Sequence, residues 1–190
     1  MNYLAHSYLS NNNPGLLVGN FIADHISGNN FQNYPAEVVV GIQLHRKIDS
    51  FTDSHPKFKE SKRFFYPAFE KYSGILVDIY FDYFLASNFK IKSGIELEKY
   101  CKQVYEVYNK YIAILPEHSS RFLQYAIKNN IYFEYSKITG IETVLSHLSH
   151  RINHNVRLNE SLIHFKENEL RLKSNFDEFF SDAVNKFLPH

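Results

Sequence analysis

Apolar residues recur every three to four positions along most of this chain, the spacing that places them on one face of an α-helix. Strand-like alternation is weak throughout. Asn13 is a good N-cap, and Pro14 suits the first position of the helix that follows it. The pattern predicts helices over about 14–27, 35–52, 57–69, 74–88 and 97–116, from 122 onward, along a stripe over 141–172 that is interrupted at 153–155, and over 176–187. The sequence therefore predicts an all-α fold.

Length and composition favour a single domain. The chain has 190 residues, of which 44% are apolar and 16% aromatic, including 17 Phe and 14 Tyr. It is long enough to bury one large core, and large side chains are available to fill it. No internal repeat and no linker rich in Gly, Ser and Pro divides it. We expect residues 1–190 to form one helical bundle.

Charge and cysteine content exclude several classes of protein. A formal charge of +1 gives no general attraction to nucleic acid, and the single cysteine, Cys101, excludes an intrachain disulfide and a Cys-based zinc cluster. The N-terminus lacks the features of a signal peptide, and no stretch of 18 uncharged apolar residues occurs. We expect a cytoplasmic protein that binds neither membrane nor nucleic acid.

Three pairs of polar residues stand out inside the apolar helical segments. The members of each pair are four residues apart: Asn20 with Asp24, His45 with Asp49, and Asp78 with Asp82. This spacing puts both side chains on one helix face, so each pair can face a common target. Carboxylates in apolar surroundings are costly to bury unless a cation or hydrogen bonds compensate. A divalent metal site is the simplest explanation.

Other interpretations of these residues stay open. Asp78 and Asp82 could form buried ion pairs without a metal. The available cations would include arginines: Arg46, Arg63 and Arg151. His45 and Asp49 could form a hydrogen bond within their helix. His6 lies in an apolar stretch and alone would be typical of a core histidine, so it joins the candidate ligands only because of the other pairs.

Two groups of basic residues are candidates for substrate binding. Arg151 lies in a His-rich stretch, 147–154, and its guanidinium could bind phosphate oxygens in a bidentate way. The basic cluster of 57–63, including Lys59 and Lys62, could receive an acidic protein. Either group could instead be a solvated helix face. The sequence contains no GxGxxG, GxxxxGK[ST], HExxH, GxSxG or CxxC motif, which argues against many cofactor enzymes.

Four ordered blocks of sequence resemble the acyl carrier protein phosphodiesterase family. They are MNYLAH at 1–6, GNFIAD at 19–24, GIQLHRKIDSFTDSHP at 41–56 and DIYFDYFLA at 78–86. The resemblance is strongest over residues 1 to about 90. The family commonly has a histidine after the second carboxylate of the last block, where this chain has Tyr83.

The resemblance implies an all-helical fold related, in divergent form, to the HD-domain metal-dependent phosphohydrolases. It also implies manganese-dependent hydrolysis of holo-acyl carrier protein, which releases 4′-phosphopantetheine from the carrier's serine. The positions that match the family's motifs are His6, Asn20, Asp24, His45, Arg46, Asp49, Asp53, Asp78 and Asp82.

The leading hypothesis is thus a metal-dependent phosphodiesterase acting on acyl carrier protein. The residues expected to hold the ion are His45, Asp49, Asp24 and Asp78, with His6 or Asp82. Manganese is the expected ion, with Mg²⁺ or Fe²⁺ as alternatives. Asp24, His45, Arg46 and Asp49 are the expected catalytic residues, and Asn20, Lys59, Lys62 and Arg151 the expected substrate-binding ones.

Two other functions stay open, and the sequence sets neither the oligomeric state nor the general acid. A metal-dependent phosphohydrolase could act on a nucleotide or another small phosphoester. Alternatively, a non-catalytic helical binding protein could keep the polar pairs as buried ion pairs. The last would be indifferent to manganese and to chelators.

Overall fold

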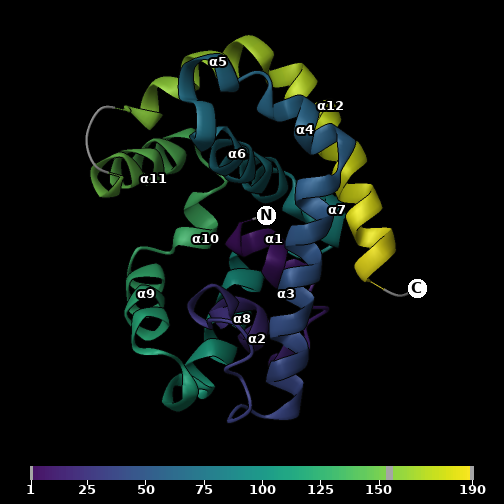
Figure 1. Ribbon diagram of the computed structural model, residues 1–190, viewed down its shortest axis with the longest axis vertical. Helices are drawn as coiled ribbons and strands as arrows, with labels where there is room; N and C mark the ends of the chain where they lie inside the picture. Colours follow the sequence, from purple (N-terminus) through teal and green to yellow (C-terminus); the bar gives the residue numbers. More distant parts are fainter. Residues whose placement is uncertain (1, 153–155, 189–190) are drawn as a thin grey trace.

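The computed structural model describes residues 2–152 and 156–188, and in these ranges every regular element is helical (Figure 1). The predicted all-α fold is confirmed. The helices are α1 (Tyr3–Tyr8), α2 (Pro14–Ile22), α3 (Ala36–Ser54), α4 (Pro56–Lys62), α5 (Tyr66–Phe69), α6 (Ser73–Ser87), α7 (Phe89–Ser93), α8 (Leu97–Lys110), α9 (Glu117–Lys128), α10 (Ile131–Glu134), α11 (Ile138–Arg151) and α12 (Ser161–Phe187). Short 3-10 turns lie between some of them.

Helix α2 begins where the sequence predicts and ends earlier. The Asn13 side chain accepts a hydrogen bond from the backbone N–H of Leu16, and Pro14 occupies the first turn. The predicted helix over 14–27 instead stops at Ile22, because the chain tightens into a 3-10 turn over Ala23–His25 and is extended at Ile26. Asp24 therefore lies on the turn at the end of α2.

Two other predicted boundaries are wrong. The helix expected over 57–69 is divided into α4 and α5, because Pro67 has no N–H to donate and its ring clashes with a continuing helix. The helix expected over 176–187 is the second half of α12, which starts at Ser161 and contains no Gly or Pro. The predicted interruption at 153–155 lies outside the described residues.

Helix α6 is the central helix of the core. It is apolar on nearly all sides, and its Leu76, Val77, Tyr80 and Leu85 are fully buried. Helices α1, α4, α11 and α12 pack against it. One hydrophobic cluster draws residues from α1 through α12, which supports the prediction of a single domain. No helix in the described ranges has the length and apolar character needed to cross a membrane.

Helices α2 and α3 pack with their backbones in contact, and this contact brings the segments around Gly19 and Gly41 together. At Gly41 an added Cβ would lie 2.6 Å from the carbonyl oxygen of Leu16, and at Gly19 it would clash with the carbonyl oxygen of Val38. Only glycine allows this approach. Because Asn20 follows Gly19 and His45 lies one turn after Gly41, the contact places their side chains side by side.

Candidate metal and active site

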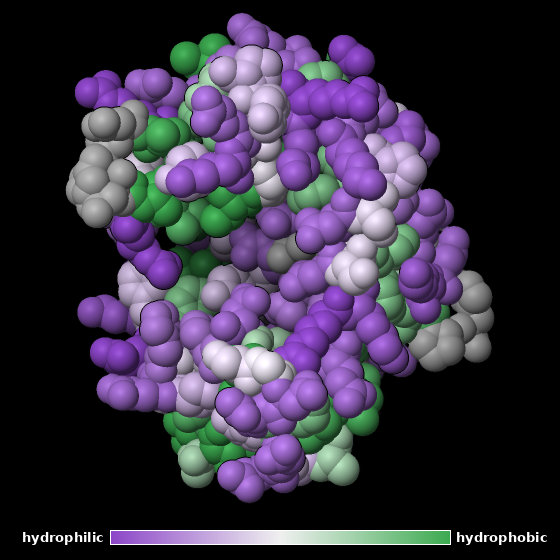
Figure 2. Space-filling model, in the orientation of Figure 1, coloured by the Kyte–Doolittle hydropathy of each residue, from purple (hydrophilic) through white to green (hydrophobic). Residues whose placement is uncertain are grey.

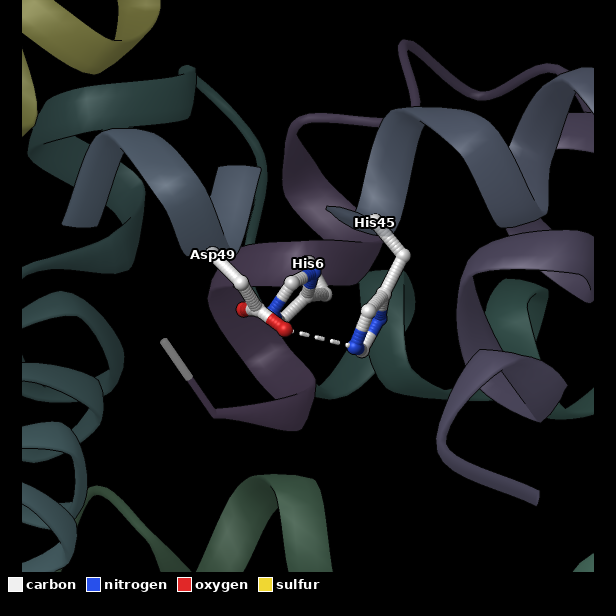
Figure 3. Close-up of side chains that lie close together, drawn as sticks. All are labelled: His6, His45 and Asp49. Carbon is white, nitrogen blue, oxygen red and sulfur yellow. Dashed lines mark hydrogen bonds and ion pairs between the residues drawn. The ribbon is translucent and has the colours of Figure 1, made fainter. Parts of the chain in front are cut away.

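Two imidazoles from different helices stack beside one carboxylate (Figure 3). The rings of His6 on α1 and His45 on α3 are 4.1 Å apart between centroids and inclined by 15°. Asp49 lies one turn after His45 on α3. One potential ligand atom of each of the three residues lies within 4.8 Å of those of the other two. A single ion could therefore contact all three.

The Asn20 side chain fixes the orientation of both imidazoles. Its amide nitrogen donates to the backbone carbonyl of His6 at 3.0 Å and to the Ser10 hydroxyl at 3.0 Å. Because a carbonyl can only accept, the amide oxygen must be the atom that faces the histidines. That oxygen lies 2.7 Å from Nδ1 of His6 and 3.0 Å from Nδ1 of His45. Both rings therefore carry hydrogen on Nδ1.

This orientation points both Nε2 atoms at carboxylates. Nε2 of His45 lies 2.9 Å from Asp49 Oδ2 and 3.1 Å from Asp24 Oδ1. Nε2 of His6 lies 3.1 Å from Asp49 Oδ1. Two neutral imidazoles would direct lone pairs at these oxygens, so the arrangement requires a proton or another cation between them. Two imidazole nitrogens with carboxylate oxygens are a donor set that divalent transition metals accept, so the residues fit a metal.

The pKa values of the two imidazoles shift in opposite directions, which favours one proton on the cluster when no metal is bound. Burial, together with the neighbouring His45, lowers the pKa of His6 to about 4. Burial also acts to lower the pKa of His45, but hydrogen bonds with Asp24 and Asp49 outweigh it and raise that pKa to about 9. The hydrogen bond with His45 lowers the pKa of Asp24. Without a metal, His45 is therefore an imidazolium between two carboxylates, and a bound cation would take that proton's place.

The cluster opens into a cavity of about 1010 Å³. The two imidazoles are buried, whereas the side chains of Asp24 and Asp49 are 60% and 42% exposed. The carboxylates are thus the part of the cluster that solvent or a ligand can reach. Six of the cavity residues from α1, α2, α3 and the turn after α2 form what we call the polar wall: His6, Asn20, Asp24, His45, Asp49 and Asp53.

The pair Asp78 and Asp82 is divided between two roles. Asp78 lines the cavity, and burial together with the nearby charges of Asp49 and Asp53 raises its pKa. Asp82 is 1% exposed and accepts hydrogen bonds from the backbone N–H groups of Leu4 at 2.9 Å and Ala5 at 3.2 Å. It therefore caps the N-terminus of α1, the helix that carries His6.

Comparisons with known proteins agree with this site. The model of the family described as acyl carrier protein phosphodiesterase matches residues 1–183. The chain belongs to the acyl carrier protein phosphodiesterase family. Its relatives of that name include one from Klebsiella pneumoniae subsp. pneumoniae, 29% identical over 97% of this chain and 96% of the relative.

Two more members of the acyl carrier protein phosphodiesterase family show how far the likeness extends. One from Enterobacter sp. (strain 638) is 32% identical over 80% of this chain and 79% of its own length. One from Escherichia coli O157:H7 is 27% identical over 95% and 94%. The match thus extends well beyond the first 90 residues. No solved structure matches the chain, and the likeness to HD-domain enzymes stays a prediction.

The basic residues chosen from the sequence are not brought together. Arg46 donates to the carbonyl oxygens of Gly28 and Ile26 and covers the Phe31 ring at 5.5 Å, so its guanidinium is turned to the loop after α2. It is not among the described residues that line the cavity. The same holds for Lys59 and Lys62 of α4, which are exposed and half-buried respectively.

Arg151, by contrast, lines the cavity from the end of α11. Burial and the Asp24 carboxylate raise the pKa of Tyr3 to about 12, and the Arg151 cation opposes that rise. The Tyr3 phenol is therefore near enough to both charges for each to change its pKa, and Arg151 lines the same cavity as the cluster. Sequence reasoning missed Tyr3, although it precedes His6 by three residues and so shares its helix face.

Tyr83, which stands where the family commonly has a histidine, lies away from the cavity. Tyr83 is half-buried and packs edge-on against Phe165, with ring centroids 5.6 Å apart. It is not among the described cavity-lining residues. The departure from the family pattern therefore lies in the packing of α6 against α12.

Proposed function

We propose that this protein is a metal-dependent phosphodiesterase that hydrolyses holo-acyl carrier protein to apo-acyl carrier protein and 4′-phosphopantetheine. Membership of the family supports the reaction and the substrate. The observation that carries the metal dependence is the convergence of both Nε2 atoms, oriented by Asn20, on the carboxylates of Asp24 and Asp49.

The residues that would hold the ion are His6, His45, Asp49 and Asp24, with Asp78 as a further carboxylate of the same cavity. The mixed nitrogen and oxygen donors suit Mn²⁺, with Fe²⁺ and Mg²⁺ as alternatives. When bound, such an ion would lower the pKa of a water molecule and offset the charge of the phosphodiester. Asp82 would act only by holding α1, and with it His6, in position.

The chain's own residues would orient the phosphodiester. Arg151, across the cavity from the cluster, would bind the phosphate oxygens. Of the two carboxylates that contact His45, that of Asp24 is the more exposed, so we assign it to face the attacking water. Water adds to phosphorus, the bond from phosphorus to the carrier's serine oxygen breaks, and that oxygen takes up a proton.

Docking of the carrier is a separate part of the proposal. Carrier proteins of this kind are acidic substrates, and α4 presents Lys59 on an exposed face with Lys62 one turn further. Replacing both lysines by glutamate should raise KM for holo-acyl carrier protein and weaken its dependence on salt. An unchanged KM in Lys59→Glu, Lys62→Glu would remove α4 from the docking surface without touching the reaction.

The reaction itself is tested by incubating the protein with holo-acyl carrier protein and Mn²⁺ and weighing the carrier by mass spectrometry. Loss of the phosphopantetheine mass, abolished by chelator and by His45→Ala, is the expected result. Asn175→Ala is a matched control, because Asn175 is buried and bonded to Ser61 but does not line the cavity. An intact carrier after incubation with metal-loaded protein would contradict the proposal and favour a small phosphoester as substrate.

A further inference from the structure

The two sides of the cavity differ in chemistry. The polar wall comes from the chain between α1 and α3, whereas the opposite side, from α9, α10 and α11, combines aliphatic and aromatic side chains with His147, His150 and Arg151. Figure 2 shows the hollow near the centre of this face, with hydrophobic residues beside it where Figure 1 places α10 and α11. We call these apolar residues the apolar wall: Phe122, Ile131, Val144, Leu148 and Ile152.

Helix α11 carries both part of the apolar wall and the Arg151 cation. Val144 and Leu148 are four residues apart on one helix face, and Arg151 follows on the same face at the end of the helix. The distance along the axis from Val144 to Arg151 is about 10 Å at the ordinary rise of a helix. The apolar stripe on α11 therefore ends beside the Arg151 cation, which lines the same cavity.

The apolar side chains at the end of α11 are only partly covered by the rest of the protein. Val144 and Leu148 on α11 and Ile152 just after it pack against the edge of the core but are only half-buried, so part of each side chain lines the cavity. The cavity, at about 1010 Å³, is at the upper end of the range of small-molecule sites. A phosphate group at Arg151 would leave most of this space, and the whole apolar wall, without contact.

We propose that the apolar wall binds the pantetheine arm of the substrate, with Val144 and Leu148 contacting the carbon chain that follows the phosphate. This inference rests on the proposed function for the identity of the ligand. The arm begins with a geminal dimethyl carbon next to the phosphate-bearing carbon and continues through two amides to a thiol. Its apolar end is thus adjacent to the phosphate, in the same order as Leu148 and Arg151 on α11.

This placement gives the apolar wall a role in specificity. A phosphodiester without the arm would contact only the polar wall and Arg151, so it would lack the binding energy that the arm contributes. The protein should therefore distinguish holo-acyl carrier protein from small diesters mainly through α10 and α11, and the polar wall should treat both alike.

The test combines a binding measurement with two substrates. Val144→Phe would fill the wall, Leu148→Ala would remove part of it, and Thr143→Phe adds the same ring at an exposed neighbouring position outside the cavity. Free pantetheine, which has no phosphate, is titrated into each purified protein by calorimetry. Kinetics are measured with holo-acyl carrier protein and with bis(p-nitrophenyl) phosphate, and thermal unfolding checks that each variant is folded.

Val144→Phe should weaken pantetheine binding and raise KM for holo-acyl carrier protein, each roughly tenfold, while the small diester is turned over at nearly the wild-type rate. Leu148→Ala should act in the same direction, and Thr143→Phe should change neither. Unchanged pantetheine binding in both wall variants, or an equal loss on the two substrates, would overturn the inference. If the wild type leaves holo-acyl carrier protein intact, the proposed function fails, whereas the pantetheine titration still decides whether the wall binds the arm.

Discussion

The two sides of the cavity depend on the sequence in different ways. On the polar wall each functional side chain is also a partner of the next, because Asn20, His6, His45 and Asp49 form one network of hydrogen bonds. On the apolar wall the side chains have no such partners, and one apolar residue can replace another of similar volume. Binding by the first wall therefore depends on residue identity, and binding by the second on the shape that α9, α10 and α11 leave open.

Among the changes proposed to the two walls, replacing Asp49 by alanine should have the largest effect on activity. Asp49 contacts both imidazoles, so its loss would remove a proposed metal ligand and leave His6 and His45 without their shared carboxylate. We expect kcat/KM for holo-acyl carrier protein to fall by more than about a hundredfold, with the small diester affected equally. Activity of Asp49→Ala within tenfold of wild type would show that the cluster is not the reacting centre.

Replacing Asn20 by alanine should weaken metal binding without removing a ligand. The variant loses the oxygen that holds hydrogen on both Nδ1 atoms, so the rings can rotate or change tautomer. Loss of such an outer-shell partner commonly costs 10- to 100-fold in metal affinity, and we expect Mn²⁺ binding in Asn20→Ala to weaken by about this factor. Asn175→Ala, in which a buried amide is removed elsewhere, should bind Mn²⁺ normally. Equal affinities in the two variants would exclude the positioning role.

The two arginines give a smaller and more selective test. Arg151→Ala should raise KM for both substrates, by roughly tenfold, because the variant loses the cavity-lining cation that we propose binds the phosphate. Arg46→Ala should change KM by less than about threefold, since Arg46 is bonded to the loop after α2. Steady-state kinetics on the two variants test this difference. A larger rise in KM for Arg46→Ala than for Arg151→Ala would support the catalytic role that the sequence suggested for Arg46.

Tyr83→His should have the smallest effect. The residue packs against Phe165 outside the cavity, so restoring the family's usual histidine should change kcat/KM by less than about threefold. The expected change is instead in thermal stability, through the altered contact between α6 and α12. A large gain in activity would show that this position acts on the reaction.

The sequence predicts the content of the polar wall better than its geometry. Spacing of four along a helix correctly grouped His45 with Asp49, and the apolar setting of Asp82 correctly indicated burial. Spacing also predicted that Asp78 and Asp82 act together, whereas the cap of α1 takes Asp82 and the cavity takes Asp78. Helical periodicity shows which residues share a face, but what that face meets depends on packing between helices.

Residues distant in sequence account for what could not be predicted. The contact of His6 with Asn20 and His45 requires the close approach of α2 and α3 at Gly19 and Gly41, together with the Asp82 cap on α1. No local pattern contains this information. The apolar wall could not be told apart from core in the sequence, because a helix face that lines a cavity has the same period as one that packs.

The most direct test of the account is the affinity of Mn²⁺ for wild type and for His6→Ala, measured by titration with detection of free Mn²⁺ by electron paramagnetic resonance. His6 is the proposed ligand that only the three-dimensional arrangement joins to His45 and Asp49. We predict that the wild type binds Mn²⁺ and that His6→Ala binds it at least about tenfold more weakly while remaining folded. Equal affinity in the two proteins would contradict the metal site described here.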